Sequence, residues 1–146
     1  KNLLVYIYKS LKNKNIQNLG YYIGGMKPIN LKESESKQII LATYSMASEG
    51  LDIKTLSTLI MATPKKDIEQ SVGRIMRQKH DNPMVIDIID YHDVFQKQWK
   101  ERKKFYNKNN YKIMYTENYY SDYWIELKNK VVNKKSKNEC LINVIE

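Results

Sequence analysis

The clearest pattern along the chain is an amphipathic stretch, "TPKKDIEQSVGRIMRQ", which runs from Thr63 to Gln78. A helix turns by about 100° per residue, and on such a helix the apolar side chains of this stretch fall within one narrow stripe. These side chains are Ile68, Val72 and Ile75. The polar side chains on the opposite side, spaced i, i+4 and i+7, are Gln70, Arg74 and Arg77. The pattern predicts a helix with one face for a core and another for an anion.

The beginning of this helix is marked by two residues. Thr63 is a favourable N-cap residue. Pro64 suits the first helical position, because its fixed φ fits a helix and its missing N–H needs no partner there. We therefore expect the helix to begin at Pro64.

Short apolar runs elsewhere alternate with helical patterns. The run "LLVYIYKSLKN" at 3–13 has six apolar or aromatic residues in a row, as a strand would, but its apolar residues also recur at i+4, which favours a helix. The stretch "PINLKESES" at 28–36 reads as a polar loop, and His92–Asn107 as a basic amphipathic helix. The predicted strands are "LGYYIGG" at 19–25, which ends in a glycine turn, the buried runs "QIILATY" at 38–44 and "TLIMAT" at 58–63, "PMVIDIID" at 83–90, and a last strand "YKIMY" at 111–115.

Strands that alternate with helices predict an α/β fold, with a mostly parallel sheet and helices on both of its faces. Ligands of such sheets bind at the carboxyl ends of the strands. Thr43, Thr63 and Tyr91 all fall at the ends of predicted strands. These positions are therefore the first places to look for a site.

The pattern weakens after about Asn118. The charge-rich stretch "KNKVVNKKSKNE" at 128–139 reads as a tail or linker. We therefore expect one domain over residues 1–117 and a C-terminal extension or linker over residues 118–146.

The chain is strongly basic, because 25 Lys and Arg against 16 Asp and Glu give its 146 residues a net charge of +9. This balance fits a nucleic-acid partner, and a solvated lysine-rich surface equally well. The single cysteine, Cys140, excludes an internal disulfide and a thiolate zinc site, which favours a reducing, intracellular compartment. His80 and His92 lack metal-ligand spacing, so we expect no metal site. No apolar run approaches the ~20 residues that cross a bilayer.

Three segments together resemble a known family. "ATYSMASEGLDI" (Ala42–Ile53) and "QSVGRIMRQ" (Gln70–Gln78) are similar to motifs V and VI of superfamily 2 helicases. "YYIGGMK" (Tyr21–Lys27) is similar to the glycine-containing segment that precedes them. The order and spacing of these motifs match those of the family over about Leu19–Asp90, and their sequences are most similar to helicases of large DNA viruses. Such a protein is expected in the host cytoplasm or the virion.

The resemblance implies a motor of two RecA-like domains, with ATP between them and a strand of DNA or RNA across both. This chain looks like the second domain, because it has neither a G-x-x-x-x-G-K-[ST] loop nor the Asp-Glu pair that holds Mg²⁺. ATP and Mg²⁺ are then held mainly by the N-terminal RecA-like domain of the same protein. The chain begins at Lys1 and lacks a clear motif IV, unless 3–13 is a degenerate one, so we expect it to be a piece of a longer protein.

The resemblance also assigns the polar face of the amphipathic helix described first. Arg74 and Arg77 match the arginine fingers, which stabilise the charge that spreads over phosphate oxygens during phosphoryl transfer. Gln70 matches a residue that hydrogen-bonds near the nucleotide, and Gly73 leaves room for close approach. The family often has a basic residue where Ser71 stands, so one anion contact is missing here. On the residues alone, a solvated arginine face explains the same pattern.

Gly50 and Asp52, in "EGLDI", match the nucleotide-side turn of the family. Asp52 would accept a hydrogen bond from a ribose hydroxyl or pair with a finger arginine, since a carboxylate beside a triphosphate is otherwise repelled. The alternative role for Asp52 is the capping of a turn.

Five residues match nucleic-acid contacts of the family: Thr43, Ser45, Gly24, Gly25 and Lys27. The two hydroxyls suit a phosphate, although local backbone capping also explains them. The glycines let a backbone approach the strand closely, with Lys27 beside them, although a plain turn explains the glycines almost as well.

The segment "QKQWKERKKFYNKNNYK" mixes lysines, Arg102 and aromatic side chains. It suits a stacking and phosphate surface for nucleic acid. The favoured interpretation is plainer: Phe95 and Trp99 pack the helix onto the sheet, and the lysines are solvated.

The leading hypothesis is therefore the C-terminal motor domain of an ATP-dependent DNA or RNA helicase or translocase. The full-length protein is the enzyme, and the fragment alone is expected to be inactive. The alternatives are a non-motor nucleic-acid-binding domain on the same fold and a structural scaffold of a viral particle. The latter predicts no ATPase activity and no salt-dependent binding of nucleic acid.

Overall fold

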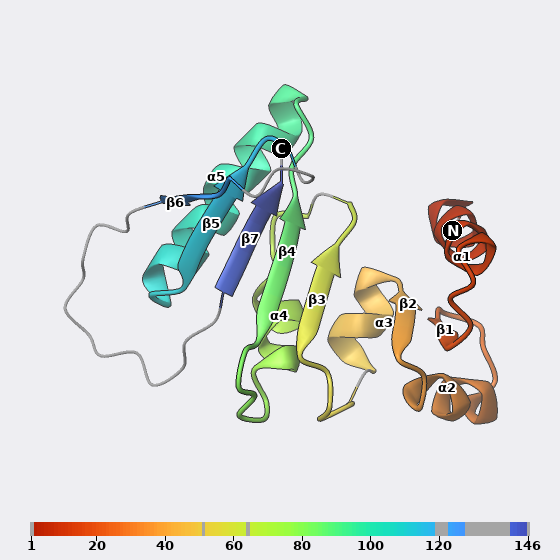
Figure 1. Ribbon diagram of the computed structural model, residues 1–146. Coiled ribbons are helices and arrows are strands. Elements are labelled where there is room, and N and C mark those ends of the chain that lie inside the picture. The colour runs from red at the N-terminus through yellow and green to blue at the C-terminus, as the bar shows by residue number, and fades with distance from the viewer. Residues whose placement is uncertain (1, 51, 64, 119–122, 128–140, 146) are drawn as a thin grey trace. The chain divides into compact units, whose positions relative to one another are not determined.

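The computed structural model describes residues 2–50, 52–63, 65–118, 123–127 and 141–145 (Figure 1). The chain divides into two compact units, Lys1–Ile53 and Lys54–Glu146, and each is described by itself. Within the described residues, no helix is long and apolar enough to cross a membrane.

The first unit is built around two short parallel strands. Its elements are α1 (Asn2–Asn13), β1 (Leu19–Tyr22), α2 (Pro28–Glu35), β2 (Ile39–Ala42) and α3 (Tyr44–Glu49). Leu19 lies opposite Ile39, and Tyr22 lies opposite Ala42. The helix expected at 3–13 is confirmed as α1, and the glycine turn after β1 is confirmed by a φ of +88° at Gly25.

The polar loop expected at 28–36 is wrong, because these residues form α2. Pro28 occupies the start of the helix, where its fixed φ is favourable, and Lys27 before it has extended backbone angles. At the other end the Ser36 N–H donates to the Glu33 carbonyl at 3.2 Å, and the Lys37 N–H donates to the Ser34 carbonyl at 3.1 Å. The signals at its ends define this helix, whereas its side chains lack the apolar periodicity that would have predicted it.

The second unit holds a five-stranded sheet with two helices. Its elements are β3 (Thr58–Met61), α4 (Glu69–Ile75), β4 (Met84–Ile88), α5 (Asp93–Lys108), β5 (Lys112–Thr116), β6 (Ile125–Leu127) and β7 (Leu141–Ile145). The strand order is β3-β4-β7-β5-β6, and all neighbours are parallel except β5 and β6. The predicted α/β fold with a mostly parallel sheet is confirmed.

The strand at 111–115 was expected to be the last, and this is wrong. β7 follows it in the chain and lies between β4 and β5, so that Ile142 stands between Val85 and Ile113 (Figure 1). β6 and β7 both fall within residues 118–146, whose separation from a domain at 1–117 stays a prediction. The charge-rich stretch at 128–139 lies outside the described residues.

The core of the second unit lies on one face of this sheet. Val85, Ile113, Ile142 and Val144 are fully buried there. In Figure 1, α4 and α5 both lie behind the sheet, on this same face. On the opposite face Ile60 is 59% exposed, so β3 is less buried than its sequence predicts. Helices on both faces were expected, and within the described part of this unit they cover one.

The amphipathic helix begins later than expected, at Glu69 instead of Pro64. A helix from Pro64 would need the Lys65 carbonyl to accept from the Glu69 N–H. Instead the Lys65 carbonyl accepts from Arg102 at 2.9 Å, and the Glu69 N–H donates to Asp67 Oδ1 at 3.3 Å. The N-cap expected at Thr63 is therefore wrong. The apolar stripe is confirmed, since its three residues are buried: Ile68, Val72 and Ile75.

Candidate nucleotide and nucleic-acid site

The polar face of α4 is accessible, as its pattern predicts. Gln70 and Gly73 are exposed, and Arg74 is half-buried. Among the described residues, no atom outside the backbone of α4 and the two neighbouring residues lies within 4 Å of the place where a Cβ on Gly73 would stand. The helix therefore presents an amide, a guanidinium group and an open space beside them, which together suit an anionic ligand.

Arg77 is exposed but lies two residues beyond the end of α4, so the i+7 helical spacing from Gln70 is not kept. α4 lies toward the ends at which β3 and β4 begin (Figure 1). Arg74 and Arg77 thus stand on the segment that leads to the amino end of β4. Thr43 directly follows β2 and so lies at the carboxyl end of a strand, where ligands of such sheets were expected, whereas these arginines do not.

Ser71, where the family often has a basic residue, is buried, and in the described part of the chain its Oγ has no hydrogen-bond partner. It lies beside Val72, on the core side of α4. A basic side chain here would have to leave the core to meet an anion. The small serine therefore fits the packing of this helix.

The residues that match motif V begin at the end of β2. Thr43 occupies the N-cap position of α3, but its side chain makes no capping hydrogen bond. Its Oγ1 lies 3.4 Å from Ser45 Oγ, and Ser45 is exposed. The two hydroxyls lie side by side at the surface, so local capping does not account for Thr43.

Gly50 ends α3, and its N–H donates to the Met46 carbonyl at 3.0 Å. The hydroxyl of the buried Tyr22 donates to the Gly50 carbonyl at 2.9 Å, and Glu35 Oε1 lies 3.3 Å from the same hydroxyl. Asp52, two residues on, is exposed. Tyr22, at the end of β1, thus holds the backbone at Gly50, where the segment with these two predicted nucleotide contacts begins.

Gly24, Gly25 and Lys27 lie together in the exposed turn between β1 and α2. A left-handed φ of +88° makes glycine the natural residue at Gly25. At Gly24 nothing lies within 4 Å of a built Cβ, so packing in its own unit does not require a glycine there.

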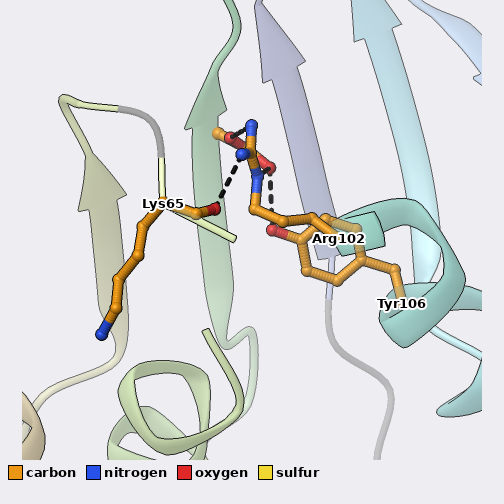
Figure 2. A network of polar contacts seen from close by, with 4 residues as sticks. Lys65, Arg102 and Tyr106 are labelled. Carbon is orange, nitrogen blue, oxygen red and sulfur yellow. Dashed lines mark hydrogen bonds and ion pairs between the residues drawn. The ribbon is translucent and has the colours of Figure 1, made fainter. Parts of the chain in front are cut away.

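A buried polar network joins β4, α5 and the segment before α4, and sequence reasoning missed it (Figure 2). Arg102 donates from Nε to Asp87 Oδ2 at 2.8 Å and from Nη2 to Oδ1 at 3.0 Å. Its Nη1 donates to the Lys65 carbonyl at 2.9 Å, and the Tyr106 hydroxyl donates to Asp87 Oδ2 at 2.9 Å. The hypothesis that Arg102 contributes to a nucleic-acid surface is wrong, because its side chain is 1% exposed.

The charge of Asp87 depends on two opposing effects. Burial raises the pKa of the Asp87 carboxyl above its usual value, and the hydrogen bonds from Arg102 and Tyr106 oppose this rise. The sequence signal for the network was an aspartate at an inward position of the apolar run "PMVIDIID". A buried carboxylate needs a partner, and α5 supplies it.

Among the described residues, no group of three or more His, Cys, Asp and Glu side chains is arranged to hold a metal ion. Cys140 lies outside the described residues.

Comparison with known proteins identifies relatives among viral helicases. No family model matches the chain, and no solved structure matches it. It is 46% identical over 134 residues to "Putative ATP-dependent RNA helicase L396" of Acanthamoeba polyphaga mimivirus, covering 88% of this chain and 25% of the relative. It is 32% identical over 123 residues to "Putative ATP-dependent RNA helicase QP509L" of African swine fever virus (strain Badajoz 1971 Vero-adapted), covering 77% of this chain and 24% of that protein.

A third relative is "Putative helicase 161L" of Invertebrate iridescent virus 6, which is 32% identical over 90 residues. This match covers 58% of the chain and 20% of the relative. The chain thus spans about a quarter or less of the length of these relatives. The likeness to helicases of large DNA viruses is confirmed, because relatives named as putative helicases match between 58% and 88% of this chain.

Proposed function

We propose that this chain is the C-terminal motor domain of an ATP-dependent helicase or translocase. It supplies arginine fingers to an ATP site whose other wall belongs to an N-terminal RecA-like domain, and it contacts the phosphates of a DNA or RNA strand. The observation that carries the proposal is the polar face of α4, where Gln70 and Arg74 lie outside the core beside the open space at Gly73.

The residues of this face suit a polyphosphate. Arginine presents several N–H donors in a planar fork that matches phosphate oxygens, and it stays charged at any physiological pH. Arg74 and Arg77 would donate to those oxygens, and Gln70 would hydrogen-bond beside them. The missing side chain at Gly73 lets the ligand approach the helix backbone.

ATP with Mg²⁺, when bound, supplies the phosphoryl group whose transfer powers the motor. Asp52 would accept a hydrogen bond from the ribose, because a carboxylate without such a donor would repel the phosphates. The Tyr22 hydroxyl fixes the backbone at Gly50 and so keeps this turn in place. Mg²⁺ itself would be held mainly by the N-terminal domain.

The nucleic-acid contacts would come from the first unit. The hydroxyls of Thr43 and Ser45 are 3.4 Å apart at the end of β2, and both can donate to one phosphate group. Lys27 is exposed beside the glycine turn and can pair with another. Such contacts hold the backbone without reading bases, as a motor that moves along any sequence requires.

The test is ATP turnover by the full-length protein with Arg74→Ala, Arg77→Ala and, as a matched control, the exposed Lys79→Ala. Loss of a finger lowers the rate by about 10³–10⁵. We expect kcat to fall steeply in both arginine variants, with a much smaller change in ATP affinity, and the control to stay near wild type. Equal and small changes in both quantities would leave a non-motor nucleic-acid-binding domain as the better explanation.

A further inference from the structure

We infer that Arg102 is a positioning residue: together with Asp87, it sets where α4 presents Gln70 and Arg74. This inference rests on the proposed function of α4. Arg102 itself cannot reach a ligand, because its side chain is 1% exposed, as is that of Asp87. Its effect must therefore pass through the segment that it holds.

Two of the three hydrogen bonds from Arg102 go to Asp87, and the third goes to the Lys65 carbonyl. Nε and Nη2 pair with both oxygens of Asp87, which fixes the plane of the guanidinium group. The remaining nitrogen, Nη1, then points at the Lys65 carbonyl. As Figure 2 shows, this carbonyl belongs to the segment that leads from β3 into α4. A charge pair on β4 and α5 thus holds the backbone four residues before the helix begins at Glu69.

The segment between Lys65 and α4 is fixed at both ends. Arg102 holds the Lys65 carbonyl, and Ile68, at the N-cap position of α4, is 1% exposed in the core. Lys66 and Asp67 between them are exposed. No side chain caps the start of α4 at Ile68. The bond from Arg102 connects this approach to α5, whereas the contact from the Glu69 N–H to Asp67 Oδ1 at 3.3 Å stays within the approach itself.

The restraint matters because catalytic geometry is sensitive to small displacements. A displacement of about 1 Å can lower a rate by about 10²-fold. α4 has seven residues, and Arg74 stands only five after its first residue. Because the helix is so short and moves as one rigid element, a displacement of its first residue displaces Arg74 by a similar distance.

The deciding experiment compares Arg102→Lys with Tyr106→Phe in the full-length protein. Both variants remove hydrogen bonds to Asp87, but only Arg102→Lys removes the donor that holds the Lys65 carbonyl, since one ammonium group cannot replace the three-way fork. We expect Arg102→Lys to lower kcat by about 10- to 100-fold with KM for ATP changed less than about twofold. Tyr106→Phe and the exposed control Lys104→Ala are expected to keep near wild-type turnover.

A second measurement does not depend on turnover. Amide hydrogen exchange of the nucleotide-free protein should become faster at residues 66–75 in Arg102→Lys, and stay unchanged there in Tyr106→Phe. Wild-type exchange and turnover in Arg102→Lys would overturn the inference, and so would equal loss of turnover in both variants. Should Arg102→Lys fail to fold, Asp87→Glu moves the guanidinium group by one methylene and gives the same comparison with Tyr106→Phe.

Failure of this inference is distinguishable from failure of the proposed function. If Arg74→Ala keeps full turnover, the role of α4 in catalysis is wrong. If Arg74→Ala is inactive while Arg102→Lys turns over normally, the proposed function stands and only the positioning role of Arg102 is wrong.

Discussion

The hydroxyl of Tyr22 donates to the carbonyl of Gly50 over 2.9 Å, and so ties the end of α3 to β1. The two residues are 28 positions apart in the chain, and Tyr22 is 3% exposed. The bond is partly buried, and a hydrogen bond of this kind contributes about 0.5–1.5 kcal/mol net to stability. The turn at Gly50, which matches motif V, therefore depends on a side chain from another motif.

Tyr22→Phe is expected to lower the free energy of unfolding by about 1 kcal/mol, because it deletes only the hydroxyl. Urea unfolding followed by circular dichroism measures this change. Tyr6→Phe is the matched control, since Tyr6 is 69% exposed, and its stability should equal that of the wild type. Equal stability of both variants would show that the bond contributes nothing net.

Gly20→Ala is expected to destabilise the first unit by about 1–3 kcal/mol through overpacking. A Cβ on Gly20 would stand 3.0 Å from Cα and Cβ of Ser34 and from Cγ of Lys37. The Ser34 atoms belong to or adjoin the backbone of α2 and cannot move aside cheaply. Gly24→Ala is the control, because a Cβ there meets nothing within 4 Å. Thermal unfolding of the two variants gives the comparison.

Arg102→Leu is expected to cost about 3–5 kcal/mol of stability, because it leaves the Asp87 carboxylate buried without its cation. Replacing both residues by leucine should cost less than the two single changes added together, since no charge is then left unpaired. A double-mutant cycle by urea unfolding measures this coupling. Additive effects would contradict the ion pair. The exposed pair of Lys104 and Glu101 should show no measurable coupling.

Lys27→Ala in the full-length protein is expected to weaken binding of single-stranded nucleic acid about equally for all sequences. Each phosphate contact that is lost reduces the slope of log K against log salt by about 1. Fluorescence anisotropy at several salt concentrations measures the slope. Lys104→Ala on α5 is the control, and an unchanged slope in Lys27→Ala would remove this residue from the interface.

The 146-residue chain by itself is expected to hydrolyse ATP negligibly, because it lacks a phosphate-cradling loop and so supplies only part of the site. A phosphate-release assay on the purified chain, with the full-length protein as the positive control, measures this activity. Robust turnover by the chain alone would refute the two-domain site.

Elements with a strong apolar period could be predicted from the sequence, and those set by distant contacts could not. The stripe of Ile68, Val72 and Ile75 gave the buried face of α4 correctly. The start of that helix was misplaced because Arg102, 37 residues away, takes the carbonyl of Lys65. No local pattern contains such a contact.

For the candidate site, too, the exposure of side chains on the helix could be predicted from the sequence, and the contacts made by distant residues could not. The exposure of Gln70 and Gly73 follows from the same wheel that buries the stripe, whereas Arg77 is exposed in the segment after the helix. The environment of Ser71 was not foreseen, because a motif comparison says which residue stands at a position but not which way the helix turns it. The tie between Tyr22 and Gly50 joins two motifs and becomes visible only in three dimensions.

The place of β7 has a consequence for how the protein is made. β3, β4 and β5 leave the ribosome before β7, the strand that joins β4 to β5. During that interval the nascent chain presents open strand edges, which favour pairing with other chains. Synthesis of this protein should therefore depend on chaperones that cover these edges, and truncation before Leu141 should yield two half-sheets prone to aggregation.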